Sequence, residues 1–217
     1  MGDIGWLLRS LPVMAGDLPR FDPGDTPDDP FQLFRCWLGA AVVAGVREPH
    51  TMFLSTVDEQ ARPDTRVVML RDLDARGWQF VANRTSAKGR QLTANPAAAL
   101  GLHWHEQGRQ IRVRGTVVDL GPEAAAADFL GRPQGSRLAT LNSAQSDVIA
   151  DPADVGLAAA EAERLLAEHP DFVPASHVLY AVAPDSVEFW QGDASRRHVR
   201  LRYRRTSDGW HREQLWP

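Results

Sequence analysis

The amino-acid sequence predicts an α+β domain that is mainly β: an antiparallel barrel or strongly coiled sheet with peripheral helices. Strand-like stretches follow one another from residue 52 to residue 120, separated by short polar turns such as Asp58-Glu59-Gln60. Strands joined by such short turns pair antiparallel, because a parallel neighbour needs a crossover of about a dozen residues. The chain contains neither G-x-G-x-x-G nor G-x-x-x-x-G-K-[ST], so Rossmann and P-loop folds are not supported.

Residues 1–28 are rich in Gly, Pro and Asp, and we expect an N-terminal arm ahead of one domain that spans residues 29–217. The first residues lack the basic start and apolar run of a signal peptide, and no later stretch approaches the length of a membrane span. The single cysteine, Cys36, excludes an internal disulfide, and we expect it on a helix with its side chain in the hydrophobic core. These features predict a cytoplasmic protein with no membrane partner.

The first helix of the domain is expected to begin at Asp29-Pro30, an N-cap followed by proline, and to end at Gly45. Its apolar face is predicted at Phe31, Phe34, Leu38, Ala41 and Val42. Five strands are then expected, at residues 52–57, 65–70, 78–82, 98–104 and 110–120. A short helix capped by Ser86 lies among them and runs to Asn95, where Pro96 stops it.

The second half of the chain predicts helices at residues 122–130 and 153–168, then strands at 177–182 and 186–189 and a final hairpin at 199–215. The helix at 153–168 is expected to bury Val155, Leu157, Ala160, Leu165 and Leu166. Arginines crowd residues 196–205, but the net charge of −4 favours one polar strand face over a nucleic-acid site. His103 and His105 have no Cys or carboxylate at ligand spacing, so no metal site is expected.

An anion site is predicted at the start of the short helix. Lys88 is the one lysine of the chain, all other Lys or Arg side chains being arginine. An ammonium suits a single phosphate oxygen, and the Ser86 hydroxyl and free helix N–H groups lie beside it in sequence. The alternative is an ordinary solvated surface lysine.

Further polar residues extend this prediction to an anionic ligand with an aromatic head. Arg66 opens a strand, Gln110 begins the long fifth strand, and Gln145-Ser146 lies in a loop between helices. The segment Glu188-Phe189-Trp190-Gln191-Gly192 and the run Arg196 to Arg200 follow near the C-terminus. Arginine and lysine bind phosphate, glutamine binds ring carbonyl or nitrogen atoms, and tryptophan offers a stacking wall.

The order and spacing of five segments resemble the pyridoxine 5'-phosphate oxidase family of flavin enzymes, from about Asp29 to Pro217. They are Ser86-Ala87-Lys88-Gly89 with Asn95-Pro96, Arg109 to Gly115, Arg132-Pro133 with Ser136, Gln145-Ser146, and Glu188 to Gly192. The resemblance implies an FMN-binding split barrel and a homodimer with FMN at its interface. It also implies an oxidase in which a substrate hydride passes to FMN and O2 reoxidises the flavin, giving hydrogen peroxide.

The resemblance assigns roles by position. The implied FMN-binding residues are Arg66, Val67, Val68, Met69, Val81, Ala82, Ala87, Lys88, Gln110, Gln145, Ser146, Trp190 and Arg200. The implied substrate-binding residues are Arg71, Asp128, Arg132, Ser136, Arg196 and His198. Of these, Arg196 and His198 are predicted to be catalytic, orienting the substrate and moving a proton.

The substrate half departs from the family pattern. Vitamin B6 oxidases usually carry Lys where this chain has Arg71 and Tyr where it has Asp128, and a carboxylate there would repel a phosphate dianion. The W-G-G-type segment is not reproduced by residues 172–177, and R-L-H-D-R becomes Arg196-Arg197-His198-Val199-Arg200. These features and Gly45 to Pro49 resemble the branch of flavin oxidases of phenazine (antibiotic) biosynthesis.

The sequence therefore predicts an FMN-dependent oxidoreductase acting on a reduced, dihydrophenazine-like N-heteroaromatic. Two alternatives stay open. One is a pyridoxine/pyridoxamine 5'-phosphate oxidase that makes pyridoxal 5'-phosphate, and the other is a flavin- or haem-binding protein without turnover.

Overall fold

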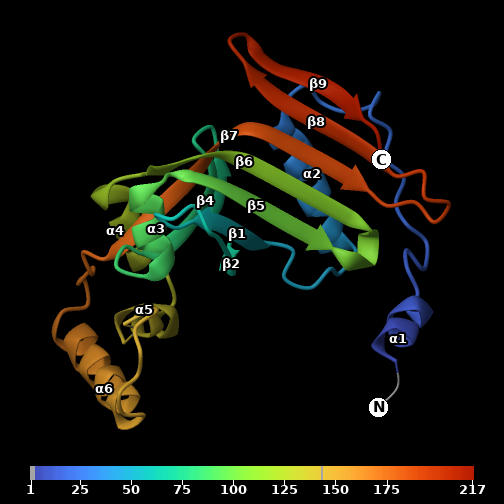
Figure 1. The fold of residues 1–217 in the computed structure, drawn as a ribbon. Helices are drawn as coiled ribbons and strands as arrows, with labels where there is room; N and C mark the ends of the chain where they lie inside the picture. Colours follow the sequence, from blue (N-terminus) through green and yellow to red (C-terminus); the bar gives the residue numbers. More distant parts are fainter. Residues whose placement is uncertain (1–2, 143) are drawn as a thin grey trace. The chain divides into compact units, whose positions relative to one another are not determined.

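The computed structural model describes residues 3–142 and 144–217. The chain runs from an N-terminal arm to a C-terminal hairpin, with strands and helices largely grouped in successive runs (Figure 1). The helices are α1 (Ile4–Ser10), α2 (Pro30–Val43), α3 (Ala87–Ala94), α4 (Pro122–Leu130), α5 (Gln134–Leu141) and α6 (Ala153–Glu168), with a 3-10 turn, η1 (His105–Gln107). The strands are β1 (Thr51–Val57), β2 (Pro63–Met69), β3 (Asp72–Asp74), β4 (Gly77–Asn83), β5 (Ala97–Trp104), β6 (Arg109–Asp119), β7 (His177–Gln191), β8 (Val199–Thr206) and β9 (Gly209–Leu215).

The described strands form one curled sheet in the order β2-β1-β5-β6-β7-β4-β3, and β8 pairs with both β7 and β9. This confirms the predicted α+β class with a split-barrel sheet. By contacts the chain divides into two compact units. The first comprises the chain up to Thr51, Gly101–Val113 and Asp185–Pro217, and the second comprises Met52–Leu100 and Arg114–Pro184.

Helix α2 of the first unit begins as predicted. The side chain of Asp29 accepts a hydrogen bond from the Phe31 amide, and Gly45 follows the helix with a φ of +73°. Its buried face differs from the prediction, because it holds Leu33 and Trp37 as well as Phe31, Phe34 and Ala41. The ring of Trp37 meets Phe189 edge-on at 5.1 Å between centroids.

Two predicted core positions of α2 are wrong. Val42 is 60% exposed, and Cys36 is exposed although it was expected in the core. The exposure of Cys36 and of Val42 both follow from the burial of Trp37. Successive residues of a helix are about 100° apart, so turning Trp37 toward the core turns Cys36 away from it, and Val42 lies off the same stripe. The large indole sets which stripe of the helix faces the sheet.

The N-terminal arm and the final hairpin also belong to the first unit. The hairpin is confirmed as β8 and β9, which pair from Arg200↔Leu215 to Thr206↔Gly209 and bury Leu201 and Tyr203. The Tyr203 hydroxyl donates to the carbonyl of Pro27 at 2.7 Å, which fixes the end of the arm. The arm contains one helix, α1, that was not predicted, because seven residues are too few for a clear period.

In the second unit, β4 pairs with the first half of β7, from Trp78↔Val182 to Asn83↔His177. The two strands predicted at 177–182 and 186–189 are wrong as separate elements, because β7 runs continuously from His177 to Gln191. Pro184 lies between the segment paired with β4 and the segment paired with β8, which begins at Ser186. Because proline has no backbone N–H, a position outside both paired segments means that neither the β4–β7 pairing nor the β7–β8 pairing loses a hydrogen bond.

The helices of the second unit match the predicted ranges at α3, α4 and α6, whereas β3 and α5 were missed. The predicted buried face of α6 is wrong in part. Ala162 and Leu166 are buried, but Val155 and Leu157 are 49% and 70% exposed. No helix in the described part of the chain is long and apolar enough to span a membrane.

Strand β6 approaches β7 closely at Gly115. A Cβ built there would lie 2.0 Å from the carbonyl oxygen of Ala183, which is backbone and cannot swing away. We predict that Gly115→Ala lowers the free energy of unfolding by about 3 kcal/mol, because the strands must separate to admit the methyl group. Gly39→Ala is the matched control: its Cβ would meet nothing, and the better helix propensity of alanine should add about 0.5–1 kcal/mol. Urea denaturation measures both, and equal stabilities would contradict the prediction.

Candidate ligand pocket

A pocket of about 330 Å³ lies in the second unit. Strands β2 and β4, helices α3 and α5 and the start of β7 contribute its walls. The lining residues are Val67, Val68, Met69, Arg71, Val81, Ala82, Asn83, Lys88, Arg132, Ser136, Ala139, Thr140, Gln145 and His177. Ten residues assigned to cofactor or substrate from the sequence are brought together here: Val67, Val68, Met69, Arg71, Val81, Ala82, Lys88, Arg132, Ser136 and Gln145.

One end of the pocket is the predicted anion site at the start of α3. The Ser86 side chain caps the helix, accepting from the Gly89 amide at 3.2 Å and donating to the Asn83 carbonyl at 2.7 Å. These two bonds engage the hydroxyl that was expected to face a phosphate. Lys88 donates from Nζ to Oε1 of Gln145, and the Ala87 amide donates to Oγ of Ser146 at 3.1 Å. The loop that carries Gln145-Ser146 is thereby tied to the helix start.

A second cation, Arg66, belongs to the same end. Its Nη1 donates to Oγ1 of Thr56 at 2.6 Å, its Nη2 donates to Oε1 of Gln91 at 3.1 Å, and it pairs with Asp64. Burial lowers the pKa of Lys88, and the nearby charge of Arg66 lowers it further. An anion bound between these two side chains would relieve both effects, which suits a phosphate group.

The other end of the pocket carries Arg71 and His177, and both contact Asp128 of α4, which lines a neighbouring pocket. Nε of Arg71 lies 2.9 Å from Oδ1 of Asp128, and Nε2 of His177 lies 3.1 Å from Oδ2. Burial alone would raise the pKa of Asp128, but hydrogen bonds from His177 and Arg71 and the charge of Arg71 hold it below its ordinary value. Asp128 is therefore ionised at neutral pH, and its charge compensates that of Arg71.

Arg132 and Ser136 complete this end. Nη1 of Arg132 donates to the hydroxyl of Thr140 at 3.0 Å, and Thr140 donates to the Ser136 carbonyl. Burial lowers the pKa of Arg132, although Asp128 opposes that shift. His177 is the site residue that the sequence analysis missed, and its signal was a lone histidine at the start of an apolar strand.

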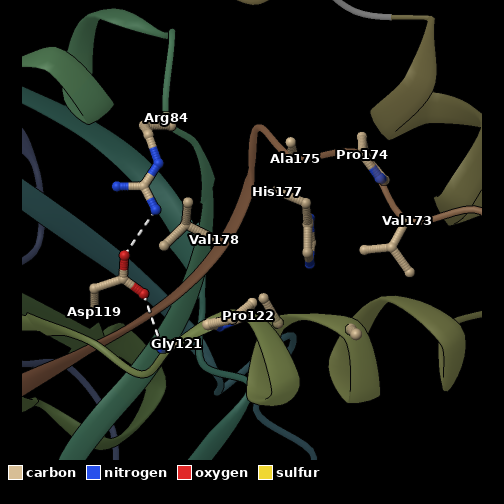
Figure 2. A pocket seen from close by; sticks show the side chains of 11 residues that line it. Arg84, Asp119, Gly121, Pro122, Val173, Pro174, Ala175, His177 and Val178 are labelled. Carbon is tan, nitrogen blue, oxygen red and sulfur yellow. Dashed lines mark hydrogen bonds and ion pairs between the residues drawn. The ribbon is translucent and has the colours of Figure 1, made fainter.

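His177 also borders a second, more apolar pocket of about 300 Å³ (Figure 2). Figure 2 shows the ring of His177 between Pro174 and helix α4, with an ion pair of Arg84 and Asp119 at 2.7 Å on the far side. Its remaining walls are mainly alanine, valine and proline. The imidazole is therefore the wall that the two pockets share.

The other predicted site residues, Gln110, Trp190, Arg196, His198 and Arg200, lie in the first unit. The ring centroids of Trp190 and His198 are 4.9 Å apart, and Nδ1 of His198 accepts from the Asp193 amide at 3.1 Å. That bond requires the ring hydrogen of a neutral His198 to sit on Nε2. Arg196 adopts a φ of +63°, and Arg200 pairs with Glu188 at 2.8 Å. The ring contact of Trp190 with His198 and the pairing of Trp190 with Arg200 across β7 and β8 bring these three residues together.

Comparisons with known proteins find matches over most of the chain. Residues 38–166 match the family model "Pyridoxamine 5'-phosphate oxidase", and residues 177–217 match "Pyridoxine 5'-phosphate oxidase C-terminal dimerisation region". A pyridoxine/pyridoxamine 5'-phosphate oxidase of Pseudomonas paraeruginosa is 43% identical over 215 residues, covering 97% of this chain and 100% of the relative. One from Neisseria meningitidis is 41% identical over 196 residues, covering 89% and 92% of the two chains.

Two solved structures resemble the fold. PhzG from Burkholderia lata, in complex with tetrahydrophenazine-1-carboxylic acid, has a TM-score of 0.85 and 33% identity, covering 93% of this chain and 100% of that one. An FMN-binding protein from Nostoc punctiforme has a TM-score of 0.67 at 18% identity, covering 85% and 97%, and shows the fold alone.

The ionised state of Asp128 gives a test by pH. Because its pKa is lowered in the folded chain, its contribution to stability is present above the ordinary carboxyl pKa of about 4 and is lost as pH falls through the folded value. We predict that Asp128→Asn costs about 1–2 kcal/mol of unfolding free energy at pH 7 and much less near pH 3. Urea denaturation at the two pH values measures this. A loss that is equal at both would show that the carboxyl is not ionised in the fold.

Proposed function

Because this chain belongs to the pyridoxamine 5'-phosphate oxidase family, we propose that it is an FMN-dependent oxidase of a reduced N-heteroaromatic metabolite. The substrate would give up a hydride to the flavin, and O2 would regenerate the flavin with release of hydrogen peroxide. The observation that carries the choice of substrate is the ion pair of the Asp128 carboxylate with Arg71, a residue of the pocket wall.

The residues present fit FMN. Lys88, Arg66 and the start of α3 offer a phosphate group two cations and helix N–H groups. Val67, Met69 and Val81 offer a ring system an apolar wall, and Val67 and Met69 are 54% and 37% exposed. When bound, FMN supplies the hydride acceptor. The roles of Gln110, Trp190 and Arg200 toward FMN remain part of this proposal.

The substrate end favours a ligand with less negative charge than a phosphate ester. A phosphate dianion needs several uncompensated donors, and here one of the two arginines is already paired with a carboxylate. A carboxylated heteroaromatic carries one negative charge and would be satisfied by Arg132 and Ser136. The relative PhzG, 33% identical, was solved with such a molecule, tetrahydrophenazine-1-carboxylic acid. This similarity supports the phenazine-type substrate.

Arg196 and His198 are proposed to orient the substrate and to move its proton. Because Nδ1 of His198 accepts from the Asp193 amide, a neutral imidazole holds its hydrogen on Nε2 and donates a hydrogen bond from there. To take up the substrate's proton, the ring would have to release the Asp193 amide from Nδ1. A homodimer is proposed because residues 177–217 match a dimerisation region. The exposed apolar side chains of β1 and β2, among them Phe53 at 51%, offer further surface to a second copy.

A second candidate is a true pyridoxine/pyridoxamine 5'-phosphate oxidase. The 43% identity to the Pseudomonas relative, higher than the 33% identity to PhzG, favours it. A flavin-binding protein without turnover is a third reading, and the fixed imidazole of His198 weighs against it.

The first test of the proposed function is reconstitution. The purified protein should bind FMN with a yellow spectrum, reject FAD, and sediment as a dimer when loaded. Preference for FAD, or a monomer that retains FMN, would contradict it.

Lys88→Ala should weaken FMN binding by about 1.5–3 kcal/mol, because one charge-assisted contact to phosphate is lost. Quenching of flavin fluorescence during titration of the apoprotein gives the affinity. Arg90→Ala removes a positive charge from the exposed side of the same helix and should leave the affinity nearly unchanged. If both variants bind like wild type, Lys88 is a solvated surface residue.

The double substitution Arg71→Lys with Asp128→Tyr should raise kcat/KM for pyridoxine 5'-phosphate by about tenfold or more, because it removes the carboxylate that compensates the cation at position 71. It should lower kcat/KM for a carboxylated reduced heteroaromatic. Oxygen uptake with each substrate measures the change. A wild-type enzyme that already turns over pyridoxine 5'-phosphate efficiently would favour the second candidate.

A further inference from the structure

His177 is a buried titratable group that the proposed reaction does not use. Its side chain is 2% exposed, and its Nε2 lies 3.1 Å from a carboxylate whose own side chain is 9% exposed. Its ring meets the ring of Phe129 in a T-shaped contact, with 5.1 Å between centroids and 67° between planes. Both contacts come from α4, so the imidazole is held by a hydrogen bond and by an aromatic contact.

The hydrogen bond has a definite polarity. An ionised carboxylate can only accept, so Nε2 of His177 carries the hydrogen and donates it to Oδ2 of Asp128. The second carboxylate oxygen accepts from Nε of Arg71, which follows β2. The two donors on two different elements thus determine which way the carboxylate faces.

These contacts determine which positive charges at one end of the pocket are compensated. Arg71, Arg132, Ser136 and His177 all line this end. Arg71 is compensated by Asp128, whereas the hydrogen bond of Arg132 goes to the neutral hydroxyl of Thr140. Arg132 therefore presents a positive charge that no direct carboxylate contact compensates among the described residues.

We propose that His177 is a specificity-determining residue that acts through Asp128: by holding this carboxylate on Arg71, it makes the pocket select aromatic monoanions over aromatic dianions. The inference rests on the proposed function, because it assumes that this pocket receives the substrate. It adds a residue outside the predicted site, and it names the property that is selected as the charge of the ligand.

Stability alone does not account for the arrangement. A buried ion pair is weak support for a fold, since desolvation offsets much of its attraction. Here His177 lines the ligand pocket and also borders the apolar pocket in Figure 2, and Arg71, the other partner of Asp128, lines the ligand pocket too. A role in selecting ligands makes use of this position, whereas a role in packing does not need it.

Binding of two matched probes tests the proposal. 1-Naphthoate and 1-naphthyl phosphate share one ring system and differ in charge, being a monoanion and a dianion at pH 8. Isothermal titration calorimetry gives the ratio of their dissociation constants for the protein as purified and after FMN is added. Wild type should prefer the carboxylate.

Three variants separate the proposal from a structural role. Asp128→Asn should shift the ratio toward the phosphate by about tenfold or more, and His177→Leu should shift it the same way by about threefold or more. His177→Gln should stay within about twofold of wild type, because the glutamine amide can replace the donor at Nε2. His103→Gln, an exposed histidine outside the pocket, is the control. If the variants change both affinities equally, or not at all, the proposal is overturned.

A spectroscopic readout keeps the test independent of turnover and of the leucine variant. Nitrogen-15 resonances of the histidine rings should show His177 with its hydrogen on Nε2, and this signal should change in Asp128→Asn. A ring with a bare Nε2 would overturn the proposal. Failure to bind either probe would contradict it and the proposed function together. Normal FMN binding and turnover with an unchanged charge preference would defeat this inference alone.

Discussion

A carboxylate placed among cations is the feature on which the chemistry of this pocket depends. Asp128 contacts Arg71 at 2.9 Å and His177 at 3.1 Å, so its negative charge is compensated within the protein before any ligand binds. An arginine that would otherwise attract a phosphate is thereby compensated. Arg66 is compensated by Asp64 in the same way. Lys88, with the helix N–H groups of α3, and Arg132 are therefore the positive groups left for a phosphate-bearing cofactor and for the substrate.

The fold supplies the positions for this arrangement. Lys88 and the loop with Gln145 and Ser146 are fixed by the N-cap of α3, where Ser86 uses both hydrogen-bonding functions of its hydroxyl. At the opposite end, Arg71 follows β2, Asp128 lies on α4 and His177 begins β7, so the fold brings these residues together from three parts of the chain.

Local patterns predicted the fold class and most element ranges, and the family resemblance named most of the residues that line the pocket. Asp29-Pro30, Ser86 and the hairpin at residues 199–215 are examples of these local patterns. What the sequence missed depends on tertiary contacts: the orientation of α2 follows Trp37 and not Val42, and β7 continues through Pro184 because its pairing partners change there. His177 was missed for the same reason, since only the fold brings it to Asp128.

The most direct test of the central claim is flavin reduction without oxygen. The FMN-loaded wild type would be mixed rapidly with tetrahydrophenazine-1-carboxylic acid or with pyridoxine 5'-phosphate, and the loss of flavin absorbance would be followed. The account predicts fast bleaching by the tricyclic carboxylate and slow or no bleaching by the phosphate ester. Fast bleaching by pyridoxine 5'-phosphate, with slow or no bleaching by the tricyclic carboxylate, would contradict it.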